Sequence, residues 1–79
     1  MSSENPVIPP ASPDAGKPLT EREERVLQLL CQGETQVGAA RTMGLATTTV
    51  GTYIRRARIK LGARTSWQAV ACFVRSART

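Results

Sequence analysis

The sequence predicts an all-α fold of four helices behind an irregular leader. Apolar residues recur at helical spacing in four segments, and a Thr or Ser that can cap a helix stands at the start of each. Gly33, Gly44 and Gly62 follow the first three segments, where a helix commonly ends in a left-handed residue. Roughly 60 residues would then form the domain, a marginal size for one hydrophobic core.

The leader is expected over residues 1–18, and the domain over residues 19–79. The leader holds all five prolines of the chain, and only Val7 and Ile8 in it could pack against a core. It lacks the apolar stretch of a secretory signal, and no apolar run approaches the length of a membrane span. We therefore expect a cytoplasmic protein that does not contact a membrane.

The first helix should begin after Thr20. The Thr20 hydroxyl can accept a hydrogen bond from the backbone of Glu23, while the Glu23 carboxylate reaches back to the N–H of Thr20. Three acidic residues in the first turn suit the positive end of the helix dipole. The residues expected to face the core are Val26, Leu27 and Leu30, flanked by Leu29 or Cys31.

Residues 36–61 have the spacing of two helices joined by a tight turn. Counting from Gln36, Ala40 is fifth, Gly44 ninth and Val50 fifteenth. The small residue allows the helices to cross closely, the glycine makes the turn, and the valine fills the gap between them. This spacing is the helix-turn-helix pattern. Thr35 should cap the first of these helices, and Thr47 the second, because Ala46 has no capping side chain.

The helix expected over residues 47–61 has an apolar side and an outward side rich in hydroxyl and guanidinium groups. Such groups hydrogen-bond phosphates and the edge of guanine. A solvated basic face is the plain alternative, but the helix-turn-helix spacing favours DNA. The apolar side comprises Val50, Ile54, Ala57 and Leu61, with Tyr53 at its edge, and the outward side comprises Thr48, Thr52, Arg55 and Arg56.

The charges are divided along the chain. The net charge is +5, and all six acidic residues lie in the first 34 positions. The rest of the chain is therefore a block in which every charged residue is basic, and such a block predicts a polyanionic partner. Nucleic acid fits better than a membrane, because the basic helix lacks a broad aromatic and Leu face. From Thr35 onward the charged residues are all basic: Arg41, Arg55, Arg56, Arg58, Lys60, Arg64, Arg75 and Arg78.

Neither a metal, a cofactor nor a catalytic site is expected. The chain has no His, and Cys31 and Cys72 do not have the spacing of metal ligands. We expect both cysteines to act as small core residues in a reducing compartment. No Ser or Cys nucleophile stands beside a base and there is no phosphate-binding loop, so the sequence does not predict an enzyme.

A last helix should begin after Thr65 or Ser66, with apolar residues on two of its sides. One stripe holds Trp67, Val70, Ala71, Val74 and Ala77, whereas Ala69 and Phe73 lie off it. Either these residues crowd a small core, or some of them meet a partner. We favour a contact with a second copy of the chain through Trp67, Ala69, Val70, Phe73 and Val74.

The stretches LTEREERVLQLL, GLATTTVGTY and KLGAR, together with Gly33, resemble the LuxR/GerE-type helix-turn-helix domain of bacterial regulators. The resemblance covers about residues 19–75. It implies four helices, of which the third enters the major groove of double-stranded DNA and the fourth mediates dimerisation on a two-fold-symmetric site. The chain resembles the stand-alone form of the family.

The resemblance also implies which residues contact DNA. The base-reading positions of the family follow the Thr-Val pair, which here places Gly51, Thr52 and Arg55 at the groove. Gly51 stands where a Lys or another long side chain is common, and Ala46 replaces the usual Ser cap. Phosphate contacts would come from Thr47, Thr49, Arg56, Arg58, Lys60 and Arg64.

These observations predict a sequence-specific DNA-binding transcription regulator that acts as a homodimer. The alternative is a protein-interaction module of the same fold that pairs with RNA polymerase or with another regulator. The substituted groove positions and the apolar last helix motivate that alternative. A sigma-factor-like reader of promoter DNA is a weaker variant.

Overall fold

The computed structural model describes residues 15–78, with side chains up to Ser76, and all the regular structure among them is helical. The predicted all-α fold of four helices is therefore confirmed. Most of the predicted leader, residues 1–14, lies outside the described residues. The helices are α1 (Glu21–Cys31), α2 (Gln36–Met43), α3 (Thr47–Leu61) and α4 (Ser66–Arg78).

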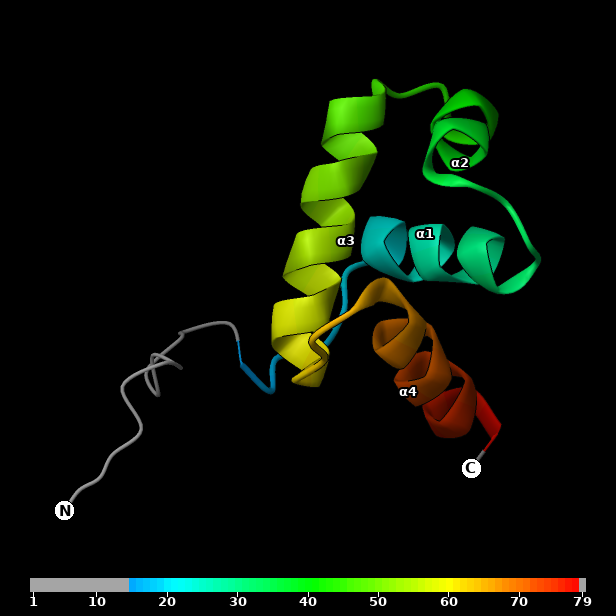
Figure 1. Ribbon diagram of the computed structural model, residues 1–79. Coiled ribbons are helices and arrows are strands. Elements are labelled where there is room, and N and C mark those ends of the chain that lie inside the picture. Colours follow the sequence, from blue (N-terminus) through cyan, green and yellow to red (C-terminus); the bar gives the residue numbers. More distant parts are fainter. Residues whose placement is uncertain (1–14, 79) are drawn as a thin grey trace, which may run out of the picture.

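The long helix α3 contacts each of the other three helices. Figure 1 shows α2, α1 and α4 arranged along one side of α3, from its N-terminal to its C-terminal end, while the opposite side is left uncovered. The chain before α1 runs beside the C-terminal end of α3, where the N–H of Gly16 donates to the carbonyl of Lys60 at 3.1 Å. This side of α3, which no other helix covers among the described residues, is called its uncovered side below.

The start of α1 has the predicted capping box. The backbone N–H of Glu23 donates to Thr20 Oγ1 at 3.2 Å, and the N–H of Thr20 donates to Glu23 Oε1 at 2.9 Å. Two donors that a helix start would leave without partners are thereby satisfied. The helix ends at Cys31, and Gly33 follows with φ +98°, which glycine adopts without steric cost.

The core consists of two clusters, and α1 and α3 contribute to both. Of the two residues considered as the flank of the α1 core face, Leu29 is buried and Cys31 is exposed. Cys72 is half-buried, so the expectation that both cysteines fill the core was wrong. The first cluster contains Val26, Leu29, Ala39, Ala40, Val50 and Ile54. The second contains Leu27, Ala57, Ala69 and Val70, with Leu19, Leu61, Phe73 and Val74 packed against it.

The turn between α2 and α3 has the predicted construction. Gly44 adopts φ +70°, and the N–H of Leu45 donates to the carbonyl of Ala40 at 2.9 Å. Ala40 and Val50 are both buried in the first cluster, so the small residue lies where the helices cross and the valine fills the gap. The start of α2 is capped as predicted, because the N–H of Gly38 donates to Thr35 Oγ1 at 3.0 Å.

One prediction about a helix start was wrong, and one choice that the sequence left open is settled by the structure. Thr47 does not cap α3: the N-cap position is Ala46, and no side chain accepts a hydrogen bond there. For α4 the sequence left open which apolar side faces the core: Ala69 and Val70 form the inward face, whereas Trp67 and Ala71 are exposed. Because α4 carries apolar residues on two sides, helical spacing alone did not determine which side faces the core. The alternative cap Thr65 is the one observed, since its Oγ1 accepts from the N–H of Gln68 at 3.1 Å.

Candidate nucleic-acid interface

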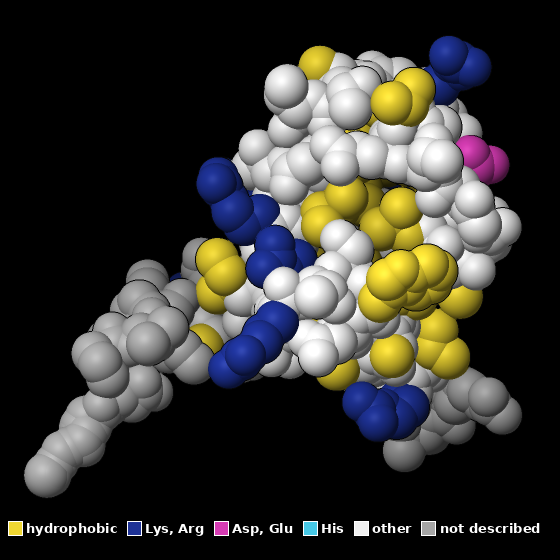
Figure 2. Space-filling view, in the orientation of Figure 1, with side chains coloured by type: hydrophobic (Ala, Val, Ile, Leu, Met, Phe, Trp, Pro, Cys, Tyr) yellow, Lys and Arg dark blue, Asp and Glu magenta, His cyan; other side chains and the backbone are white. Residues whose placement is uncertain are grey.

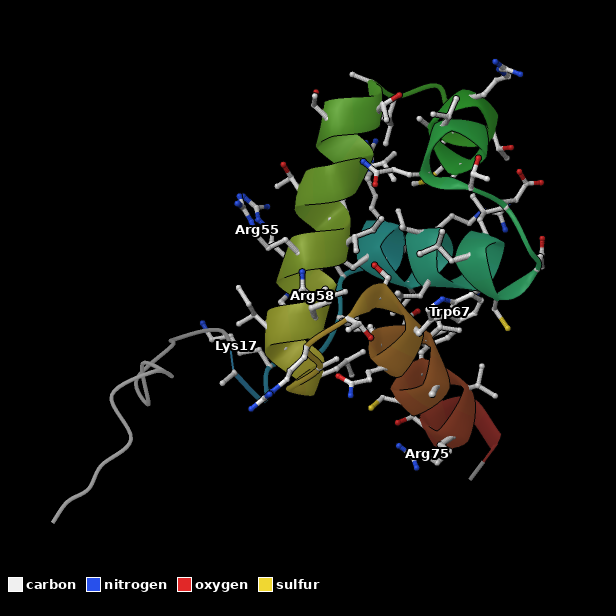
Figure 3. All side chains as sticks on the ribbon, viewed as in Figure 1. Lys17, Arg55, Arg58, Trp67 and Arg75 are labelled. Carbon is white, nitrogen blue, oxygen red and sulfur yellow. The ribbon has the colours of Figure 1, made fainter. Side chains whose placement is uncertain are left out.

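The uncovered side of α3 carries exposed basic side chains. Arg55 and Arg56 are both exposed, and Figure 3 shows Arg55 projecting away from α1, α2 and α4. Thr52 and Thr48 lie on the same side, one turn and two turns nearer the helix start than Arg55. Ile59, one turn beyond Arg55, is also exposed at 38% of its surface and completes this row. Ile59 was not among the residues named from the sequence, and only its helical spacing from Thr52 and Arg55 could have placed it on this side.

Positive and negative side chains are distributed unevenly over the surface of the domain. In Figure 2 several Lys and Arg side chains follow the α3 side of the molecule and others lie over α2 and α4, while the acidic surface visible in this view lies at the edge away from α3. Helix α3 contains no acidic residue, whereas Glu21, Glu23 and Glu24 all lie in the first turn of α1. A polyanion that approaches the uncovered side of α3 therefore meets positive charge without a nearby carboxylate on that helix.

The first turn of α3 has backbone N–H groups without a side-chain partner. A helix start leaves its first N–H groups unsatisfied unless a cap accepts from them, and Ala46 provides none. Thr47 and Thr48 are exposed there, and Thr49 is half-buried. The positive end of the helix dipole and these N–H groups together suit a phosphate oxygen.

Thr52 uses its hydroxyl hydrogen within the helix. Its Oγ1 donates to the carbonyl of Thr48 at 3.2 Å. The remaining lone pairs of the hydroxyl and the side-chain methyl are the groups that Thr52 can offer to a ligand. The residue can therefore accept a hydrogen bond or contact a methyl group, but its hydroxyl hydrogen is already used.

Beside Thr52, the flank of α3 at Gly51 is occupied by a side chain from α2. Gln36 Nε2 donates to the carbonyl of Thr47 at 3.1 Å. A Cβ on Gly51 would lie only 2.9 Å from this nitrogen, so the Gln36 amide fills the space that a side chain at position 51 would take. Sequence reasoning did not identify Gln36, because only the crossing of α2 and α3 brings it to this place.

Arg58 is turned away from the uncovered side. Its Nη2 donates to the carbonyl of Arg64 in the linker between α3 and α4, and the side chain is half-buried. Arg64 itself is exposed, and its N–H donates to Gln68 Oε1 at 2.7 Å. Arg58 thus uses one of its guanidinium N–H groups within the domain, whereas Arg64 presents its side chain to solvent.

Lys60, predicted to contact a phosphate, forms an ion pair within the domain. Its Nζ lies 2.7 Å from Glu23 Oε1, with side-chain exposures of 10% for Lys60 and 2% for Glu23. Burial by itself would raise the pKa of the Glu23 carboxyl, but the hydrogen bond from Lys60, that from the Thr20 backbone and the Lys60 charge together lower it. The pair links the end of α3 to the start of α1.

Comparison with known proteins decides the family. The model of the family described as bacterial regulatory proteins, luxR family, matches residues 17–73, more than half of the chain. The chain belongs to the luxR family. It is thus a DNA-binding helix-turn-helix transcription regulator rather than a member of an enzyme family. Neither the comparison with curated proteins nor that with solved structures found a match.

In this luxR-family chain, α4 leaves only part of its predicted dimer contact accessible. Ala69 and Val70 are buried in the second cluster at 0% and 8% exposure, so they line the core and not an open surface. Phe73 and Val74 are half-buried against the same cluster. Trp67 is 78% exposed at the start of α4, and Figure 3 shows it close to α1.

The described part of the luxR-family chain offers neither a metal cluster nor a membrane span. Within residues 15–78 no group of three His, Cys, Asp or Glu side chains is placed to hold a metal ion. No helix in this range combines the length and the hydropathy needed to cross a bilayer.

Proposed function

We propose that this luxR-family regulator recognises specific double-stranded DNA sequences as a homodimer, with α3 in the major groove. The observation that carries the proposal is the uncovered, carboxylate-free side of α3, on which Arg55 and Arg56 are exposed. An α-helix fits the major groove of B-DNA, and the base edges there distinguish all four base pairs. The three other helices hold α3 from behind.

Arg55 is the main base-reading residue in this proposal. Its guanidinium projects from the middle of α3, and arginine pairs in a bidentate manner with O6 and N7 of guanine. Thr52, whose hydroxyl hydrogen is used by Thr48, offers its methyl group to thymine. The open N–H groups at the start of α3, with Thr47, Thr49, Arg56 and Arg64, bind phosphates and fix the register of the helix in the groove.

The dimer is proposed to form through the exposed part of α4. Trp67 presents a large apolar surface to solvent, and Phe73 and Val74 lie further along the same helix with part of their surface open. Aromatic side chains of this size are typical anchors of protein interfaces. A two-fold-symmetric contact between two α4 helices would place two copies of α3 on successive half-sites.

Selection of duplexes from a random pool tests the proposal, followed by binding measurements with Arg55→Ala. The variant should lose about 1–3 kcal/mol on the selected duplex, because one bidentate contact is removed, and should stop discriminating at one base pair. The matched control is Arg41→Ala, which removes an exposed arginine from α2. The assignment of Arg55 is wrong if its replacement leaves the affinity for every duplex unchanged.

The exposure of Trp67 also supports the second candidate, a protein-interaction module that pairs with RNA polymerase or another regulator. The two candidates give opposite results in parallel assays. A stable complex with another protein, without any shift of genomic DNA fragments in a gel, would favour the interaction module. Retarded fragments that the purified protein binds alone would favour the DNA reader.

A further inference from the structure

Gly51 leaves one base-reading position of α3 without a side chain. It lies between buried Val50 and half-exposed Thr52, on the flank of α3 that faces α2. The space beside it is nevertheless filled, because a Cβ on Gly51 would lie 2.9 Å from Nε2 and 3.8 Å from Cδ of Gln36. The side chain that lies beside position 51 is therefore that of Gln36, the first residue of α2.

The amide of Gln36 is held in a defined orientation. Its Nε2 donates to the carbonyl of Thr47 at 3.1 Å. A carbonyl oxygen can only accept, so the amide must turn its nitrogen to the α3 backbone. One N–H of Nε2 and the lone pairs of Oε1 remain available, and the Gln36 side chain is exposed. Thr47 thus anchors a group that still has one donor and one acceptor.

We propose that Gln36 takes the base-reading place that Gly51 leaves empty, and that it recognises adenine. This inference rests on the proposed function, since it requires α3 to lie in the major groove. A glutamine amide pairs with adenine by accepting from N6 and donating to N7. The donor and acceptor that Gln36 retains match this pair, and a side chain that is already anchored loses less conformational freedom on binding.

Selection of duplexes from a random pool with the full chain tests the inference. The parent should enrich adenine at one position that Arg55 does not determine. In Gln36→Ala this enrichment should fall about tenfold, while the preferences at other positions and the dependence of affinity on salt stay as in the parent. The matched control is Gln28→Ala, which removes an exposed glutamine from α1 and should leave the profile unchanged.

Gly51→Ala gives a second test that keeps Gln36 in the chain. The added methyl group should displace the amide from Thr47, because the two would lie within 2.9 Å. The variant should lose the same adenine preference, although alanine in a helix interior favours folding over glycine. A thermal unfolding curve of each variant shows that the fold is retained.

Three results would overturn the inference. An unchanged adenine enrichment in Gln36→Ala would remove Gln36 from base recognition while leaving the proposed function intact. An equal loss on all duplexes would make Gln36 a phosphate contact instead. A parent protein that enriches no base at any position would contradict the proposed function itself, so the two failures are distinguishable.

Discussion

Lys60 belongs to the basic helix α3, and its ammonium group forms an ion pair within the protein. It is paired with Glu23, whose carboxylate also closes the capping box of α1. One carboxylate oxygen therefore connects the start of one helix to the end of another. The same lysine that counts towards a positive patch in the sequence has a structural role in the fold.

We predict that Lys60→Met destabilises the domain by about 3 kcal/mol, because it leaves the buried carboxylate of Glu23 without its cation. Chemical denaturation measures the change in the free energy of unfolding. Arg56→Met is the matched control, since it removes an exposed cation from the same helix and should change the stability by less than about 0.5 kcal/mol. Equal effects of the two replacements would show that the ion pair contributes nothing.

The lowered pKa of Glu23 predicts an acid-sensitive stability. Because the carboxyl binds its proton less readily in the folded chain than in the unfolded chain, its contribution is fully present above the ordinary Glu pKa of about 4.3. This contribution is lost as the pH falls through the lowered pKa of the folded state.

Glu23→Gln should reduce this pH dependence, since glutamine can keep the capping box but does not titrate. The free energy of unfolding should then fall less steeply below about pH 4 than in the parent. Glu24→Gln, at an exposed position of the same turn, is the control that should leave the slope nearly as it is. The pKa assignment fails if both variants follow the parent curve.

Roles of individual residues could be predicted from the sequence only where the partner is near in the chain. Thr20 and Glu23 are three residues apart, and their capping box was predicted correctly. Lys60 and Glu23 are 37 residues apart, so only the packing of α3 on α1 reveals that they pair. Gln36 was missed for the same reason, because its partner Thr47 belongs to the next helix.

At the level of the helices, α3 begins without the cap that α1, α2 and α4 have. Thr20, Thr35 and Thr65 each accept from a backbone N–H in the first turn of their helix, whereas the N-cap of α3 is Ala46. The helix that carries the proposed DNA contacts is thus the one whose start has open donors. A phosphate can satisfy them when DNA is bound.

We predict that Ala46→Ser raises the free energy of unfolding of the DNA-free protein by about 1 kcal/mol. The backbone of Ala46 is extended, with φ −69° and ψ 147°, so a serine there can accept from the first turn without rearrangement. Thermal unfolding measures the gain, and Ala71→Ser, at an exposed position inside α4, is the control that should give none. An unchanged or lower midpoint for Ala46→Ser would contradict the open helix start.

The faces of α1 to α3 followed from helical spacing, but that of α4 did not. Val26, Leu27, Val50 and Ile54 are buried as predicted, because each of those helices has a single apolar side. In α4 two apolar sides compete, and the fold buries the small Ala69 in one cluster with Leu27 and Ala57. The choice between the sides depends on the shape of the core, which sequence spacing does not specify.

For the whole molecule, the predicted consequence of the exposed Trp67 is a dimer that depends on concentration. Sedimentation equilibrium should show the parent changing from monomer to dimer as concentration rises. Trp67→Ser should remain monomeric at concentrations where the parent dimerises, and Ala71→Ser should behave like the parent. A dimer of unchanged affinity in Trp67→Ser would place the contact elsewhere.

The most direct test of the account follows the backbone amide signals of the isotope-labelled protein by NMR during titration with its best selected duplex. If α3 lies in the groove, the signals of Thr47 to Arg56 and of Gln36 should shift or broaden most. The signals of Glu21, Arg22 and Glu24, at the start of α1, should stay nearly fixed, because Figure 1 places α1 on the side of α3 opposite its uncovered side. Large shifts confined to α1 or α4, with α3 unaffected, would contradict the central claim that the uncovered side of α3 binds DNA.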